Sequence, residues 1–134
     1  MAGGLMPEEA KTPYHQLGGD SGVRSLVARF YQLMEEQPQF AALRALHGPD
    51  LSGPRQALYE FLSGWLGGPP LYFEKPVHRC IMSAHARLKI GPEDVRQWLS
   101  CMSQALSEFS LDPDLRQKIT AALTNFAGRM RNQA

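Results

Sequence analysis

The chain has 134 residues, and its 14 basic and 13 acidic side chains give a formal net charge of +1. This length suits a single domain, and the near-neutral charge excludes the strongly basic surface with which proteins bind nucleic acid. No apolar run approaches the ~18 residues that span a bilayer, and the first residues lack the apolar core of a secretory signal. We therefore expect a cytoplasmic, single-domain protein that binds neither nucleic acid nor membranes.

Residues 1–12 are predicted to form a flexible tail, because they contain two glycines, a proline and few apolar side chains. The folded domain is expected to span residues 13–134. Its first clear feature is an apolar stripe with spacings of three and four residues, which predicts an amphipathic helix. The stripe consists of Val23, Leu26, Val27, Phe30, Tyr31 and Met34. Asp20 or Ser21 is expected to cap this helix, and Pro38 to end it.

A short helical piece is predicted over residues 39–46, and a longer helix follows it. This helix begins after Ser52-Gly53, has Pro54 in its first turn, and ends at Gly67-Gly68. Its apolar stripe consists of Leu58, Phe61, Leu62, Trp65 and Leu66. These spacings again match one face of a helix.

Two strong helices are predicted near the end of the chain, one opening at Pro92 and the other at Asp112-Pro113. Their apolar stripes run from Val95 to Phe109 and from Leu115 to Met130. The region between, residues 71–90, shows no clear period, and a short helix from His78 to Arg87 is the best candidate within it. Because no strand-like alternation persists, the fold class is predicted to be all-α.

The four histidines and two cysteines form no recognisable catalytic or zinc motif. No histidine pair has the i, i+4 spacing of a helical zinc site, and His15 is expected at the surface. His78 and His85 are seven residues apart and would share a face of a continuous helix, so a two-histidine metal site stays an alternative. Cys80 and Cys101 are expected to be reduced, with Cys101 buried.

A set of large apolar side chains lies on several of the predicted helices. The set consists of Phe30, Tyr31, Leu58, Phe61, Leu62, Tyr72, Leu88, Ile90, Trp98 and Met102. The simplest interpretation is an ordinary core. However, Tyr31 and Trp98 each carry a polar hydrogen that needs a partner when it is buried. A protein that encloses a flat apolar cofactor needs this mixture of an apolar slot, an axial ligand and a few donors.

Several short motifs lie in order from about Pro13 to the last predicted helix. They are Tyr14 with Leu17-Gly18-Gly19, Arg29-Phe30-Tyr31-Gln32-Leu33-Met34, Leu43-Arg44-Ala45-Leu46-His47, Asp50-Leu51-Ser52-Gly53, Phe61-Leu62-Ser63-Gly64-Trp65-Leu66-Gly67-Gly68-Pro69, Tyr72, His78, His85, Ile90-Gly91 and Trp98-Leu99-Ser100-Cys101-Met102. Their order and spacing are specific, and with them the chain resembles the truncated haemoglobins of group II. The resemblance implies a two-over-two helical sandwich around haem b (iron protoporphyrin IX), with a proximal helix reduced to a turn or two.

The resemblance also assigns roles around the iron. His85 matches the proximal histidine that ligates the iron. Tyr31 matches the distal tyrosine, and Trp98 matches the group II tryptophan whose indole N–H points at the ligand. His47 matches a distal corner where members carry Tyr, Phe or His. These three donors are expected to stabilise the negative charge that develops on bound dioxygen.

Other positions match residues that contact the haem itself. Those that would pack on it are Phe30, Leu58, Phe61, Leu62, Leu88, Ile90 and Trp98. Tyr72 matches a position near the haem propionates. His78 is expected either to contact the haem edge or to face solvent.

Two residues depart from the family's pattern. Ala84 stands beside the proximal position, where the family usually has an arginine that meets a propionate. The candidates to replace it are Arg79, Arg87 or Arg55. Pro54 stands where many members have a small or polar distal residue, and proline donates no hydrogen bond. Distal polarity is therefore expected to rest on the three donors named above.

The resemblance predicts a haem protein that binds dioxygen and other small ligands, namely carbon monoxide, nitric oxide, cyanide and peroxide. Redox detoxification or ligand sensing is expected rather than bulk oxygen transport. Nitric oxide dioxygenase or peroxidase-like activity would need an external reductase. The alternative, motivated by Ala84, is a haem-free globin-fold domain with an interaction or regulatory role. Either form is expected to be a monomer or a homodimer.

Overall fold

The computed structural model describes residues 12–74 and 88–133. Its elements are α2 (Pro13–Gln16), α3 (Gly19–Glu36), the 3-10 helix η1 (Pro38–Phe40), α4 (Ala41–Ala45), α5 (Ser52–Trp65), α7 (Pro92–Leu106) and α8 (Pro113–Met130). The two described ranges contain helices and no strand, which agrees with the all-α prediction. No helix within these ranges is long and apolar enough to cross a membrane.

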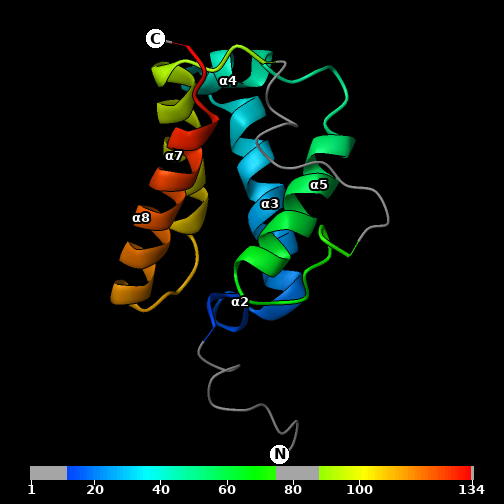
Figure 1. The fold of residues 1–134 in the computed structure, drawn as a ribbon, viewed down its shortest axis with the longest axis vertical. Helices are drawn as coiled ribbons and strands as arrows, with labels where there is room; N and C mark the ends of the chain where they lie inside the picture. The colour runs from blue at the N-terminus through cyan, green and yellow to red at the C-terminus, as the bar shows by residue number, and fades with distance from the viewer. Residues whose placement is uncertain (1–11, 75–87, 134) are drawn as a thin grey trace, which may run out of the picture.

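Helix α3 lies between α7 and α5 in the view of Figure 1. Helices α5 and α7 both pack against α3, and α8 packs against α7. All six residues of the predicted α3 stripe are buried, and Leu33 is buried with them. Because each buried leucine or phenylalanine side chain stabilises the fold by roughly 1.5–3 kcal/mol, α3 makes the largest contribution to the core.

The start of α3 differs from its prediction. The helix begins at Gly19, after Gly18 has taken a left-handed backbone conformation with φ of +109°. The predicted side-chain cap from Asp20 or Ser21 is therefore wrong. Asp20 is instead engaged one turn along the helix, where it accepts a hydrogen bond from Arg24 at 2.9 Å.

The short helix α2 was not predicted, and it closes one end of the fold. The Thr12 hydroxyl accepts a hydrogen bond from the backbone N–H of His15 at 3.2 Å, which is a typical N-terminal cap. The Tyr14 N–H donates to the carbonyl of Leu66 at 2.9 Å and so ties α2 to the end of α5. His15 is half-buried rather than at the surface, with Nδ1 3.0 Å from the Thr12 hydroxyl.

The predicted helical piece over residues 39–46 is found as η1 followed by α4. The prediction for α5 is also confirmed, since Pro54 lies in its first turn. The helix ends at Trp65, and Gly67 follows with φ of +101°, a conformation that favours glycine.

Helix α7 ends at Leu106, about one turn before the end of its predicted stripe at Phe109. The cause lies in α8, where the Arg116 guanidinium donates to the carbonyls of Leu106, at 2.8 Å, and of Phe109. Arg116 thus satisfies carbonyls that a longer helix would have used internally. At the other end of α7, the Gly91 N–H donates to the Asp94 carboxylate at 2.9 Å and caps the helix.

Gly22 allows the closest backbone approach in the core, because a Cβ there would lie 1.9 Å from the Leu17 carbonyl oxygen. Gly22→Ala is therefore expected to destabilise the fold by about 2 kcal/mol or more, as overpacking does. The matched control is Gly128→Ala in α8, where a Cβ meets nothing within 4 Å. It should stabilise the protein by roughly 0.5–1 kcal/mol. Urea unfolding of both variants measures the difference, and equal midpoints would contradict the packing argument.

Candidate functional site

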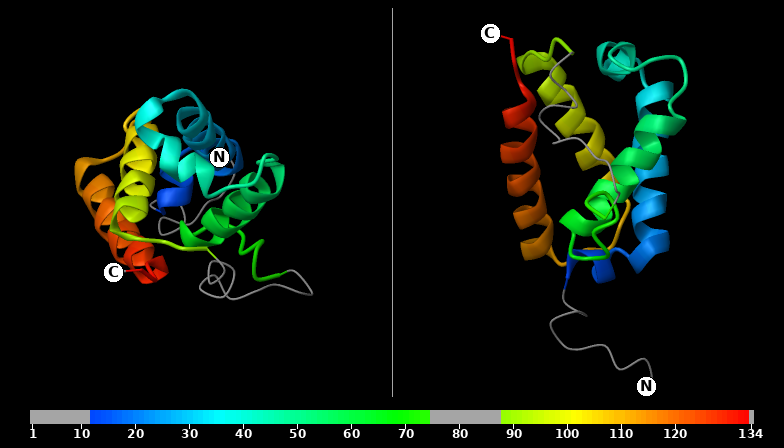
Figure 2. Two further views of the ribbon diagram at one scale, coloured as in Figure 1. Left: turned by 90° about the horizontal axis from the view of Figure 1, so that it is seen from above. Right: turned by 45° about the vertical axis from the view of Figure 1, so that its right-hand side comes forward.

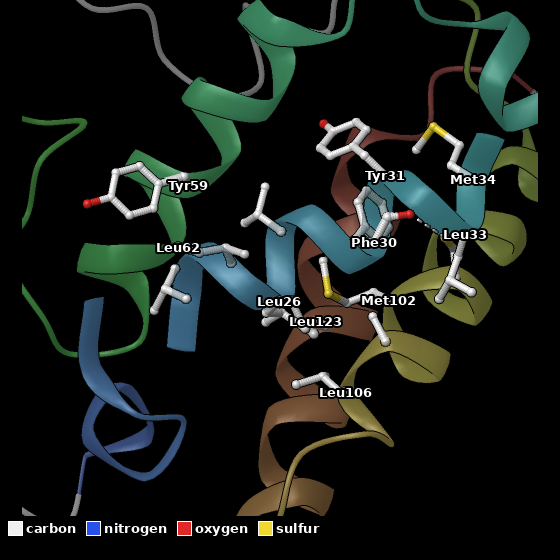
Figure 3. Packing of buried hydrophobic residues seen from close by; sticks show 14 of the residues in the cluster. Leu26, Phe30, Tyr31, Leu33, Met34, Tyr59, Leu62, Met102, Leu106 and Leu123 are labelled. Carbon is white, nitrogen blue, oxygen red and sulfur yellow. Dashed lines mark hydrogen bonds between the residues drawn. The ribbon is translucent and has the colours of Figure 1, made fainter. Parts of the chain in front are cut away.

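Tyr31 presents a hydroxyl that lacks a hydrogen-bond partner among the described residues. The side chain is only 5% exposed, and no hydrogen bond to its hydroxyl is found within the described ranges. Figure 3 shows the hydroxyl pointing away from Met102 and Leu106, which lie on the other side of α3. A hydroxyl that no described side chain engages can donate its hydrogen to a ligand that brings an acceptor.

The electrostatic environment keeps this hydroxyl protonated. Burial raises the pKa of Tyr31 above its ordinary value, the charge of Arg55 opposes that increase, and Cys101 adds to it. Because the net direction is upward, Tyr31 is a hydrogen-bond donor at neutral pH. Arg55 is exposed in the first turns of α5, and of the three arginines expected near the propionates it alone lies within the described residues.

Trp98 is a second side chain with a hydrogen-bond donor that contacts the Phe30 ring. It lies half-buried on α7, and its ring contacts the fully buried Phe30 ring with centroids 5.5 Å apart. The Tyr31 ring contacts the same Phe30 ring at 5.0 Å. In the part of the chain that the structure describes, the Trp98 indole N–H has no hydrogen-bond acceptor. Two helices therefore bring two unpaired donors to one aromatic ring.

His47 completes this group, and its protonation can be deduced. Its ring meets the Tyr31 ring edge-on, with centroids 5.8 Å apart. Its Nδ1 lies 3.0 Å from the carbonyl oxygen of Leu43. Because a carbonyl only accepts, Nδ1 carries the hydrogen, and the neutral ring then has an acceptor at Nε2. His47 can donate from Nε2 only when the imidazole is protonated. The neutral ring offers an acceptor there and not the donor that the resemblance predicts.

Gln97 is a positioning residue that the sequence did not reveal. Its side-chain oxygen accepts the Leu43 N–H at 3.0 Å, so α7 holds the residue whose carbonyl orients His47. Gln97 directly precedes Trp98 in the chain. A polar residue on a predicted helix gives no sign of such a contact, because its partner is 54 residues away in the sequence.

A second group of predicted site residues gathers around Phe61 of α5. Phe61 stacks on Phe126 of α8 with centroids 5.1 Å apart and meets the edge of Tyr72 at 6.2 Å. Leu62 is buried, and Leu58 is half-buried at the margin of the core. Aromatic side chains from α5, α8 and the loop after α5 thus form a continuous apolar wall.

Some of the remaining predicted site residues lie within the described ranges, and others lie outside them. Leu88 is half-buried and Ile90 is buried, both just before α7. His78, Cys80, Ala84 and His85, with Arg79 and Arg87, lie outside the described residues. Within residues 12–74 and 88–133, no cluster of three histidine, cysteine or acidic side chains could hold a metal ion.

Cys101 is buried, as predicted, and has a structural role. It is fully inaccessible, and its thiol donates to the carbonyl of Phe30 at 3.2 Å. Burial raises the pKa of the thiol to about 12. The thiol is therefore neutral and unreactive at neutral pH, and it helps to fix the residue that Tyr31 and Trp98 share.

Comparison with known proteins agrees with this arrangement. The model of the bacterial-like globin family matches residues 12–132. The group 2 truncated haemoglobin YjbI of Bacillus subtilis is 30% identical over 128 residues, which cover 96% of this chain and 94% of that protein.

Solved structures show the same likeness. The group II 2-on-2 haemoglobin of Agrobacterium tumefaciens is 39% identical and superposes with a TM-score of 0.86 over 100% of both chains. The oxygen-avid truncated haemoglobin of Bacillus subtilis is 30% identical, with a TM-score of 0.78 over 91% of this chain and 100% of that one. The predicted two-over-two globin fold is confirmed, and the chain belongs to the bacterial-like globin family as a group II truncated haemoglobin.

Proposed function

We propose that this protein binds haem b through His85 and holds dioxygen and related small ligands beside Tyr31, Trp98 and His47. Membership of the truncated globin family supports haem-based ligand binding in general. The specific proposal is supported by two hydrogen-bond donors, Tyr31 and Trp98, whose rings contact the same buried phenylalanine ring. Neither donor has an acceptor among the described residues. His85 lies outside the described residues, so its assignment rests on the family resemblance.

The described side chains fit a flat, largely apolar group with an iron centre. Helices α5 and α7 pack against α3, and neither packs extensively against the other among the described helices. Large half-buried apolar side chains remain at the margin of the core on three helices. They are Leu58, Trp65, Trp98, Leu99 and Phe126. Such side chains would pack on a porphyrin face, while the two donors would face a ligand.

When bound, the haem iron supplies coordination of a small ligand and one-electron redox chemistry. The chain supplies the surroundings of that ligand. Tyr31 and Trp98 would each donate a hydrogen bond to the ligand, and both of their rings pack on Phe30. Leu58 and the other apolar side chains exclude water, which strengthens each hydrogen bond.

The physiological role that suits this site is redox detoxification or ligand sensing. Two donors in a dry site favour slow ligand release, which suits chemistry or sensing better than delivery. The similar Bacillus subtilis protein is described as oxygen-avid, in keeping with a polar distal site. Turnover would draw electrons from a separate reductase.

Haem uptake is the direct test of the proposal. The purified protein should take up one haem and show a sharp Soret band that shifts when carbon monoxide is added to the reduced form. His85→Ala should lose most of its haem affinity, because the proximal ligand is removed. If the wild type takes up no haem, the haem-free interaction domain becomes the better hypothesis. Unchanged affinity in the variant would instead show that another residue ligates the iron.

The two donors should each slow the release of dioxygen. Tyr31→Phe and Trp98→Phe are each expected to speed release roughly two- to tenfold, since each removes one hydrogen bond worth about 0.5–1.5 kcal/mol. Tyr59→Phe is the matched control, because its hydroxyl is already bonded to Arg24 and Asp20. Stopped-flow measurement of dissociation separates the variants. Equal rates in Tyr31→Phe and Tyr59→Phe would exclude Tyr31 from the distal site.

The deduced tautomer of His47 predicts a pH effect. Neutral His47 presents an acceptor, whereas the protonated ring presents a donor and a positive charge. Acidification that protonates the ring should therefore lower the C–O stretching frequency of the carbon monoxide complex. His47→Phe should abolish the dependence, because phenylalanine does not titrate. Infrared spectra that do not change with pH in the wild type would place His47 away from the ligand.

A further inference from the structure

Residues 131–133 return from the end of α8 to the segment that precedes α7. The N–H groups of Asn132 and Gln133 both donate to the carbonyl of Ile90, at 2.8 and 3.0 Å. Figures 1 and 2 show this segment, in red, beside the start of α7. The contact joins positions 42 residues apart in the sequence, so it belongs to the tertiary structure and not to a local turn.

The oxygen and the nitrogen of the Asn132 side-chain amide both form hydrogen bonds with the same segment. Its Oδ1 accepts the Ile90 N–H at 2.8 Å, and its Nδ2 donates to the carbonyl of Leu88 at 2.7 Å. The Gln133 side chain in turn donates to Oδ1 at 3.3 Å, which is consistent with this orientation. Asparagine suits the position because its amide offers an acceptor and a donor together.

The segment from Leu88 to Gly91 lacks a regular structure of its own, so these bonds define its course. The Ile90 N–H and carbonyl are both bonded to Asn132, and the next N–H, of Gly91, donates to Asp94. Ile90 is nevertheless buried, with 7% of its surface exposed. An irregular segment that buries an apolar side chain must have its backbone polar groups hydrogen-bonded, and Asn132 forms most of these hydrogen bonds.

We propose that Asn132 is a positioning residue for the proximal wall of the haem site. This inference rests on the proposed function, together with the resemblance that matches Leu88 and Ile90 to positions that pack on the haem. Asn132 fixes the Leu88 carbonyl and the Ile90 N–H, so it sets where both side chains lie. The chain runs from His85 to Leu88 in three residues, so the same bonds anchor the downstream end of the proximal segment.

The main test compares Asn132→Ala with Asn125→Ala, a change at an exposed asparagine of α8 that forms no hydrogen bond within the described ranges. Haem transfer to an excess of apomyoglobin should be roughly tenfold faster in Asn132→Ala, because two hydrogen bonds are removed, and unchanged in the control. The iron–histidine stretching band of the reduced protein, measured by resonance Raman spectroscopy, should shift or broaden only in Asn132→Ala. A role confined to ending α8 would lower the melting temperature and leave this band as it is.

A second variant keeps the proposal falsifiable if Asn132→Ala does not fold. Asn132→Asp retains an acceptor for the Ile90 N–H but puts a carboxylate oxygen against the Leu88 carbonyl, where Asn132 donates at 2.7 Å, so its haem loss should also be faster than that of the wild type. Wild-type rates and an unchanged Raman band in both variants would overturn the role of Asn132 and leave the proposed function standing. A wild-type protein that takes up no haem would instead overturn the proposed function, and this inference with it.

Discussion

The burial of α3 is the constraint on which the rest of the structure depends. This helix contributes eight buried residues, and both α5 and α7 pack against it. The two flanking helices are therefore positioned by α3 and not by each other. Tyr31 and Phe30 lie next to each other on this helix, so the donor and the ring that supports it share the most constrained backbone in the molecule. A distal group placed there has little freedom to move, which favours a preorganised site.

The long helices could be predicted because their apolar periods are local properties of the sequence. The ends of those helices could not be predicted, because an apolar period does not report backbone conformation or side-chain contacts with the backbone. Helix α7 ends at Leu106, whose carbonyl accepts from Arg116, ten residues later, and from the Phe109 N–H. Helix α3 starts at Gly19 after Gly18 adopts a positive φ, without a side-chain cap. The first interaction joins two helices, and the second is a local backbone conformation that the apolar stripe does not reveal.

The candidate site, like the helices, has features that could be predicted from the sequence and features that could not. The resemblance identified Tyr31, His47 and Trp98 by type and position. In the structure Tyr31 and Trp98 contact Phe30, and His47 contacts Tyr31. The tautomer of His47 could not be predicted, because it depends on where the carbonyl of Leu43 lies. Nor could Gln97, whose contact with Leu43 joins two helices. The types of the site residues can be matched from the sequence, whereas the direction of their hydrogen bonds depends on where the folded backbone lies.

Two neutral side-chain amides tie separate parts of the candidate site together. Gln97, within α7 and next to Trp98, bonds to α4, and Asn132, just after α8, bonds to the segment before α7. Charged side chains could make similar bonds, but a charge beside an apolar cofactor is costly to desolvate and changes the field at the ligand. Amides provide direction without net charge. One amide holds α7 and the other holds the segment directly before it, so movement of this helix would displace Trp98 and Ile90, which are proposed to lie on opposite sides of the haem, together.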